Sequence, residues 1–122
     1  MRILIVGLGA GLGGVGRYLL QGWILERTGP SILALFVINL SGAFALGLVT
    51  TLAVERNLIS PDIRLLLTTG FLGGYTTFSS WMLESFQLLE TGNILRASVN
   101  IIGSAAVGLV AVYLGIVAGR IV

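Results

Sequence analysis

Three long stretches of this sequence carry no charged residue. They contain 24, 19 and 23 residues and run over positions 31–54, 65–83 and 97–119. About 20 apolar residues are enough to cross the hydrocarbon core of a bilayer as a helix. A fourth stretch, positions 3–25, is interrupted only by Arg17. The pattern therefore predicts four membrane-spanning helices joined by very short turns.

Short polar segments between these stretches supply the signals at which helices end and begin. Gly29-Pro30 breaks the chain before Ser31, and Ser60-Pro61-Asp62 is a typical helix start. Thr91-Gly92-Asn93 has the composition of a turn. We expect an all-α membrane protein with a single domain over residues 1–122. The approximate spans of its four transmembrane helices are 3–25, 31–54, 62–90 and 94–120.

The composition excludes several classes of function. Charged residues make up 10% of the chain, against about a quarter in a soluble domain. The sequence has no cysteine, histidine or lysine, so it offers no disulfide, no thiolate metal site and no plausible acid–base or nucleophilic set. We therefore expect no enzyme. The net charge of +2 comes from arginines at the helix ends, which favour lipid head groups over nucleic acid.

The arginines say little about orientation in the membrane. With four crossings, four arginines fall on the side of the termini and two on the other: Arg2, Arg56, Arg64 and Arg120 against Arg27 and Arg96. This weak bias favours termini in the cytoplasm, and it also suits a chain that inserts in both orientations.

Glycines in the first span invite two interpretations. The segment "GAGLGG", positions 9–14, matches the dinucleotide-binding pattern G-x-G-x-x-G. That fold needs an acidic residue about 20 residues further on, but here the next one comes 12 residues after the last glycine. Close helix packing in lipid is the better account, with Gly7 and Gly11, and Gly9 and Gly13, as small-residue pairs.

The third span is the unusual one. Gly70, Gly73 and Gly74 fall within five residues and are followed by Thr76 and Thr77. We expect the helix to break at Gly73-Gly74, because clustered glycines destabilise a helix. A break frees backbone carbonyls, which persist in a membrane only where protein or a cavity satisfies them. Broken helices near the bilayer midplane recur at ion sites.

The polar groups of the spans are mostly neutral hydrogen-bond donors. Hydroxyls, an amide and the positive edges of aromatic rings suit a small anion, and the same residues could also join helices. Arg17 either faces a water-filled cavity or extends to the head groups. The candidate residues of an anion path are Asn39, Phe78, Trp81, Thr77, Ser79, Ser80, Asn100 and Ser104.

Three motifs resemble one known family. "GFLGGYTTFSSWMLE", positions 70–84, is similar to the signature G-F-x-G-G-x-T-T-F-S-T-F-x-x-E of the Fluc (CrcB) fluoride channels. "GGVGRY", positions 13–18, resembles the first-helix motif of the family, and "VINLSGAFALG", positions 37–47, its asparagine motif. The resemblance covers essentially the whole chain. It implies a passive, fluoride-selective channel in the cell membrane of a microbe, exporting cytoplasmic fluoride.

The resemblance also implies an architecture. Family members form an antiparallel, dual-topology homodimer with two pores along its interface. By motif position, Asn39, Phe78 and Trp81 would line the fluoride path, with hydroxyls such as Ser80 and Ser104 beside it.

A cation site belongs to the same implied architecture. The main-chain carbonyls of Gly73 and Thr76 would bind a structural sodium ion, Na+, at the dimer centre. Arg17 would lie near an aqueous vestibule.

Three positions depart from the family pattern. Trp81 stands where phenylalanine is usual, Leu35 where many relatives have threonine, and Asn100 where some have a tyrosine in the pore. Whether the bulkier Trp81 takes the place of the phenylalanine in the path is an open question, as are the roles of Asn100 and Glu84.

Two other kinds of membrane protein fit part of the pattern. A small multidrug-type, proton-coupled exporter has a similar length, but it needs a carboxylate inside the first helix, and positions 3–25 contain none. A membrane subunit without transport activity would explain the packing of small residues, but not a broken helix followed by Phe78 and Trp81.

Overall fold

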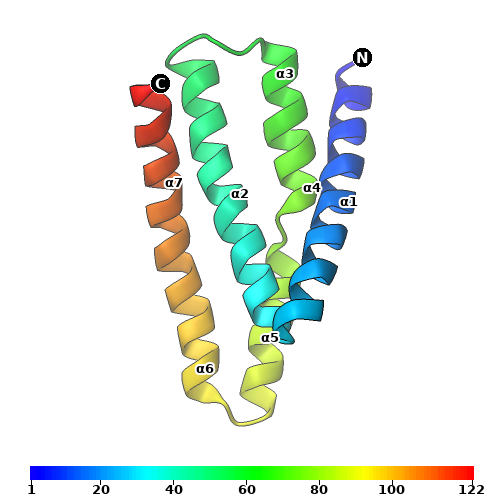
Figure 1. The fold of residues 1–122 in the computed structure, drawn as a ribbon, viewed down its shortest axis with the longest axis vertical. Coiled ribbons are helices and arrows are strands. Elements are labelled where there is room, and N and C mark those ends of the chain that lie inside the picture. Colours follow the sequence, from blue (N-terminus) through cyan, green and yellow to red (C-terminus); the bar gives the residue numbers. More distant parts are fainter.

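The computed structural model describes residues 1–122 as four antiparallel crossings built of helices alone. The first two crossings are the continuous helices α1 (Arg2–Thr28) and α2 (Ser31–Val54). The third crossing consists of α3 (Pro61–Leu65), the π-helix η1 (Leu66–Leu72), α4 (Gly73–Tyr75) and α5 (Phe78–Glu90). The fourth consists of α6 (Ile94–Ser98), the π-helix η2 (Val99–Gly103) and α7 (Ser104–Ile121). Both termini lie at the same end (Figure 1).

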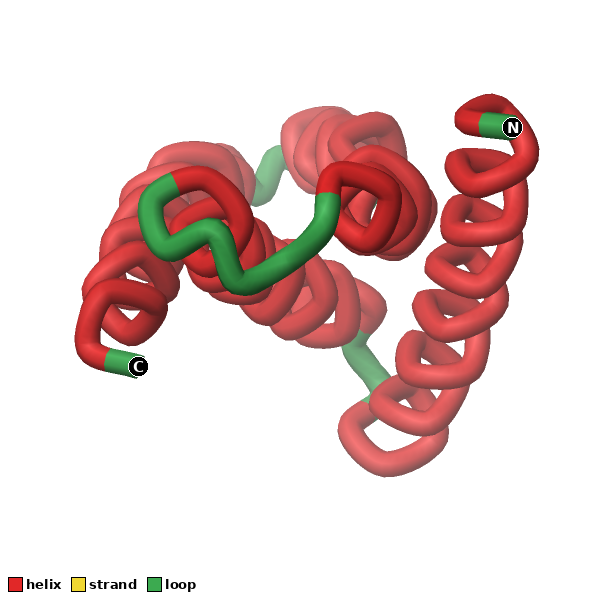
Figure 2. The backbone as a smooth tube through the Cα atoms, turned by 90° about the horizontal axis from the view of Figure 1, so that it is seen from above, coloured by secondary structure: helices red, strands yellow, loops and turns green.

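Three of the four crossings have helices that could span a membrane by their length and composition. The stretches Arg2–Thr28, Ser31–Val54 and Ile94–Ile121 are each long and apolar enough to cross a membrane. Only 19 of 122 residues are buried, and most large apolar side chains point outward, as expected for helices surrounded by lipid tails. Seen from above, α1 and α7 lie at opposite sides of the molecule, with α2 and the third crossing between them (Figure 2).

The third crossing is broken, but not where the glycine pair predicts. Gly73 begins the helical turn α4, and the chain becomes extended only at Thr76 (φ −80°, ψ 156°) and Thr77 (φ −146°, ψ 115°). The prediction of a break at Gly73-Gly74 is therefore wrong by about three residues. Gly74 instead allows α4 to pack closely on α1, because a Cβ atom there would collide with the backbone of Ala10.

Close packing of α1 on the third crossing confirms one glycine pair. A Cβ atom on Gly9 would strike the Leu66 carbonyl, and one on Gly13 would strike the Phe71 carbonyl. The other pair, Gly7 and Gly11, meets no neighbouring atom within 4 Å in this chain, so that part of the prediction stays a prediction. The whole "GAGLGG" segment lies inside α1, which excludes the strand that a dinucleotide site requires.

Replacing Gly13 with alanine is expected to destabilise the protein by about 1–3 kcal/mol, because the methyl group must displace helix backbone. The measurement is thermal unfolding of the purified protein in detergent. Gly7→Ala is the matched control on the same helix, and it should not lower stability since its surroundings are open. Equal stability of the two variants would contradict the assigned contact.

The helices α2 and α7 pack closely through a second set of small residues. Gly47 lies against the Val112 carbonyl, and Gly115 lies against the Phe44 carbonyl. The glycines of these helices that make close contacts fall into two groups. Those toward the termini hold the pair together, whereas Gly42, against the Thr76 side chain, lets α2 approach the break.

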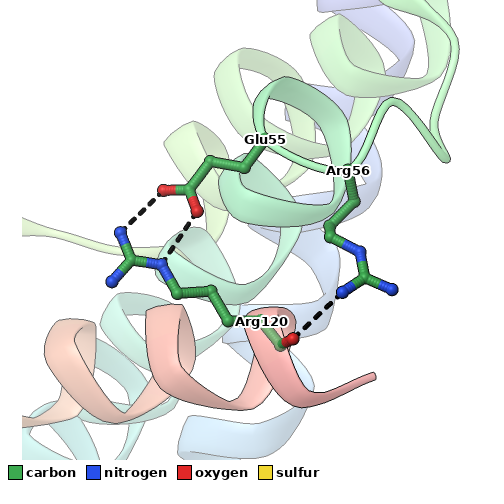
Figure 3. A network of polar contacts seen from close by, with 3 residues as sticks. All are labelled: Glu55, Arg56 and Arg120. Atoms are coloured by element: carbon green, nitrogen blue, oxygen red, sulfur yellow. Dashed lines mark hydrogen bonds and ion pairs between the residues drawn. The ribbon is translucent and has the colours of Figure 1, made fainter.

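An ion pair ties the ends of α2 and α7 together at the side of the termini (Figure 3). The Arg120 guanidinium donates from Nε to Glu55 Oε2 (2.8 Å) and from Nη2 to Glu55 Oε1 (2.9 Å). Arg56 Nη1 donates to the Arg120 carbonyl (3.0 Å). The hydrogen bonds from Arg120, helped by its positive charge, hold the pKa of the Glu55 carboxyl below its ordinary value.

Acidification is expected to remove the small stabilisation that this pair provides. Because the folded-state pKa of Glu55 is lowered, the stabilisation is complete above the ordinary carboxyl pKa and is lost as the pH falls through the folded-state value. Thermal unfolding between neutral and acidic pH measures it. Glu55→Gln should flatten part of the pH dependence. Identical pH profiles for wild type and Glu55→Gln would show that the pair contributes nothing.

Candidate functional site

One side chain forms hydrogen bonds with the backbone at the break in the third crossing. Asn39, in the middle of α2, donates from Nδ2 to the Thr77 carbonyl (3.1 Å) and accepts from the Thr77 N–H at Oδ1 (2.9 Å). The amide thus satisfies both backbone groups of Thr77, which would otherwise be exposed to a low-dielectric environment. The Thr77 hydroxyl in turn accepts from the Ser80 N–H (3.3 Å) and so caps α5.

This arrangement leaves carbonyl groups available at the break. The Thr77 N–H bonds to Asn39, so the Gly73 carbonyl lacks its usual helical partner. The Ser80 N–H bonds to the Thr77 hydroxyl, so the Thr76 carbonyl lacks its usual partner as well. These are the two carbonyls predicted to bind a cation. Gly73 is the first residue of the three-residue helix α4, and Thr76 is the extended residue that follows it, so neither carbonyl belongs to a long continuous helix.

A cavity of about 620 Å³ lies beside the break, between α2, the third crossing and α7. No charged side chain lines it. Five of the eight residues predicted for an anion path contribute to its wall, as do both residues predicted to bind a cation: Asn39, Thr77, Phe78, Trp81 and Ser104, with Gly73 and Thr76. The structure therefore brings together residues that are up to 65 positions apart in the sequence, from Asn39 to Ser104.

The other predicted residues lie outside the cavity wall. Ser79 is exposed on α5, and Ser80 is half-buried with its hydroxyl 3.1 Å from that of Thr77. Asn100 is buried and hydrogen-bonded between helices. Arg17 is half-buried on α1, with a buried Nε atom that has no hydrogen-bond partner. Their predicted roles in an anion path or a vestibule stay predictions.

Two aromatic rings meet at the cavity. The ring centroids of Phe78 and Trp81 are 5.8 Å apart, with an interplanar angle of 81°. This edge-to-face arrangement turns polarised C–H edges in two directions. The Phe78 side chain is 71% exposed in the single chain, whereas Trp81 is held by a hydrogen bond from its Nε1 to the Asn100 carbonyl (3.1 Å).

Sequence reasoning missed some residues around the site. Ser85 is buried on the face of α5 that meets η2. Its position four residues after Trp81 is the sequence signal for this, since it places both on one helix face. Thr68, on η1, also lines the cavity.

Leu35, at the position where many relatives have threonine, does not line the cavity, because it is buried in the core of the bundle. Glu84 lies on α5 with one carboxylate oxygen buried and without a partner.

A bundle of apolar helices that gathers neutral polar groups around a hollow at a helix break has the construction of a membrane transport protein. The family within that class is shown by sequence comparison. The chain belongs to the family described as CrcB-like protein, Camphor Resistance (CrcB), whose model matches residues 4–116. It is accordingly a multi-pass membrane protein.

Relatives of this chain match it over almost its full length. The fluoride-specific ion channel FluC of Chlorobium chlorochromatii is 45% identical, over 98% of this chain and 92% of that protein. The fluoride-specific ion channel FluC of Geotalea daltonii is 43% identical, over 97% of this chain and 96% of that protein. The fluoride-specific ion channel FluC 1 of Methanosarcina acetivorans is 41% identical, over 93% of this chain and 86% of that protein. By name, these relatives are channels and not enzymes.

Proposed function

We propose that this chain forms a fluoride-selective channel through which cytoplasmic fluoride leaves the cell passively. The observation that carries the proposal is the uncharged cavity beside the broken helix, where Asn39, Phe78, Trp81 and Ser104 meet. Neutral donors alone indicate only a small anion. We identify this anion as fluoride from the names of the relatives. The predicted alternative of a proton-coupled exporter loses support, since the only acidic residue of α1 is Glu26, near its end.

The wall of the cavity suits passage of an anion more than permanent binding. The second N–H of the Asn39 amide can donate to fluoride and replace part of its hydration shell. The Ser104 hydroxyl can do the same once it releases Asn100 Oδ1, to which it donates across 3.4 Å. The ring edges of Phe78 and Trp81 add weak positive potential. With no fixed cation in the wall, the ion is not trapped and can move on.

A second copy of the chain would complete the path. In one chain the cavity opens outward, and the Phe78 ring at its edge is 71% exposed. We propose that the partner covers this opening in an antiparallel homodimer with two pores, one along each side of the interface. The nearly even distribution of arginines, with four against two, supports insertion in both orientations.

The two free carbonyls support a structural sodium site at the centre of that dimer. Backbone carbonyl oxygens are suitable ligands for a hard monovalent cation. Gly73 and Thr76 have carbonyls without their usual helical partners, so the residues present fit a sodium ion. When bound, the ion would supply positive charge that compensates these dipoles in a low-dielectric environment. Arg17, with an unpaired buried Nε, would add positive potential at a vestibule.

Fluoride efflux from liposomes containing the purified protein tests the function. Vesicles loaded with potassium fluoride are diluted into fluoride-free buffer, and release is followed with a fluoride electrode after addition of a potassium ionophore. We expect rapid fluoride release and no release of chloride from matched vesicles. Chloride release at a comparable rate, or no fluoride release by folded protein, would refute the proposal.

Exchange of sodium for a bulky organic cation during purification is expected to weaken the dimer and slow fluoride efflux. The physical reason is that the carbonyls of Gly73 and Thr76 then face each other across the interface without compensation. Size-exclusion chromatography and efflux report the two effects, and return of sodium should restore both. A second bulky organic cation, returned at the same concentration in place of sodium, serves as the control for ionic strength. Unchanged dimer and unchanged efflux after the exchange would remove the sodium site from the proposal.

A further inference from the structure

Three hydrogen bonds form a closed loop that begins and ends at Trp81. The indole Nε1–H donates to the Asn100 carbonyl in η2 (3.1 Å). The Asn100 side chain donates from Nδ2 to Ser85 Oγ (2.9 Å). The Ser85 hydroxyl donates to the Trp81 carbonyl, one turn back on α5 (2.8 Å). The loop joins the side chain of Trp81 to its own backbone through two residues on two helices.

Burial makes this loop rigid. Ser85 is 2% exposed and Asn100 is 8% exposed, so water cannot readily replace either partner. The loop also uses each donor once: the Ser85 proton goes to Trp81, and the Ser85 oxygen is left to accept from Asn100. The Ser104 hydroxyl, 3.4 Å from Asn100 Oδ1, faces the remaining acceptor of that amide.

The π-helix η2 explains why a backbone carbonyl is available to the indole. In a π-turn the hydrogen-bond register shifts from i+4 to i+5, which leaves a carbonyl at the change of register without a helical N–H. Asn100 is the second residue of η2, and its carbonyl accepts from Trp81 on the facing helix. Its side chain projects to Ser85, so one residue supplies two links of the loop.

The two aromatic rings at the cavity therefore differ in freedom. Phe78 has no polar atom, and its aromatic partner is Trp81, in edge-to-face contact at 5.8 Å. Trp81 has the same contact plus a hydrogen bond to a buried element. A ring tied at its N–H cannot rotate about χ2 without breaking the loop.

We propose that Ser85 and Asn100 are positioning residues that hold Trp81 as a stationary wall of the anion path. This proposal rests on the proposed channel function. The indole N–H is engaged with the Asn100 carbonyl, so Trp81 presents a C–H edge to the ion and donates no N–H to it. The tryptophan thereby behaves toward the ion as a phenylalanine would, and the loop compensates for its larger ring by keeping it in one orientation.

The test follows the motion of Trp81 and fluoride efflux in the same protein. The chain has two tryptophans, so the variants are made with Trp23→Phe, which leaves Trp81 as the only tryptophan fluorophore. Ser85→Ala removes the central hydroxyl, Ser85→Thr retains it, and Ser85→Cys keeps the volume with a weak donor. Ser98→Ala on α6 is the matched control, because that hydroxyl takes no part in the loop.

We expect Ser85→Ala to lower the fluorescence anisotropy of Trp81 and to slow fluoride efflux about fivefold, the effect of losing one hydrogen bond. Ser85→Thr should restore both quantities, and Ser85→Cys should give intermediate values. If Ser85→Ala does not fold, the comparison of Ser85→Cys with Ser85→Thr carries the test. Added fluoride should leave the Trp81 emission maximum unchanged, since the N–H is already engaged.

The outcomes separate this proposal from the channel function. If the parent protein releases no fluoride, the channel function fails, and the anisotropy of the Ser85 variants still decides whether the loop holds the ring. If the parent releases fluoride but folded Ser85→Ala or Ser85→Cys matches it in anisotropy and efflux, the positioning role is overturned. A shift of Trp81 emission on addition of fluoride would equally overturn it, because it would place the N–H on the ion path.

Discussion

Replacing Asn39 with aspartate is expected to slow fluoride efflux by two to three orders of magnitude. The carboxylate can still accept from the Thr77 N–H, but it cannot donate to the Thr77 carbonyl as the amide does. A negative charge also enters the wall of the anion path. Two unit charges 4 Å apart interact by about 4 kcal/mol at an effective dielectric constant of about 20, which corresponds to roughly a thousandfold change.

The control for this experiment is Asn93→Asp. Asn93 lies in the exposed turn after α5, where its side chain donates only to the Thr91 hydroxyl. The two variants carry the same chemical change and differ only in where it lies. Asn93→Asp should conduct like wild type, and size-exclusion chromatography should confirm that both proteins are folded. Wild-type efflux from folded Asn39→Asp would remove Asn39 from the path.

Replacing Phe78 with isoleucine is expected to slow fluoride efflux by about two- to tenfold while the protein stays folded. The side chain is 71% exposed in one chain and makes no hydrogen bond, so little of the fold depends on it. Its ring edge, however, belongs to the cavity wall and stands against the Trp81 ring. Isoleucine has similar bulk but no quadrupole, and the lost edge interaction of about 0.5–1.5 kcal/mol corresponds to a change of about two- to tenfold.

Phe86→Ile provides the comparison on the same helix. Phe86 lies two turns beyond Phe78, is also exposed, and does not line the cavity. It should therefore conduct at the wild-type rate. A similar loss of efflux in both variants would mean that the effect comes from the membrane-facing surface of α5 and not from the ion path.

The spans of this protein could be predicted from the sequence because they depend on a local property. Charge-free stretches of sufficient length have few alternatives to membrane helices, and the turns at Gly29 and Gly92 carry the positive φ angles that their glycines permit. The start of the third crossing was equally predictable, with Ser60 accepting from the Ile63 N–H and Pro61 in the first turn.

The position of the break could not be predicted, because it depends on a partner 38 residues away. Glycines at 73 and 74 weaken the helix, but the chain leaves helical geometry where the Asn39 amide can satisfy both backbone groups of Thr77. The two π-helices could not be predicted either, because their role depends on a neighbouring helix. Nothing in "VNIIG" indicates a wider turn, and its consequence, a carbonyl for the Trp81 indole, is visible only once α5 and η2 are adjacent.

The sequence predicts which residues belong to the candidate site better than it predicts what those residues contact. Polarity, helical spacing and the family signature indicate four residues that all border the cavity: Asn39, Phe78, Trp81 and Ser104. The same pattern indicates Asn100 as a donor to the ion, but its amide donates to Ser85 on the facing helix. Side chains of this kind are interchangeable in a sequence pattern, and only the packing distinguishes a lining residue from a supporting one.

The interruption of the third crossing also constrains the order in which the chain can assemble during synthesis. The 13 residues of α5 rise only about 20 Å as a helix, which is too short for a hydrocarbon core of about 30 Å. Neither half of this crossing can therefore stand alone in lipid, and the groups exposed at Thr77 are satisfied by a residue of α2. Since α2 leaves the ribosome first, the docking partner is already in place when the broken segment arrives. A circular permutation that delivered the third crossing before α2 would deprive it of that partner at the moment of insertion.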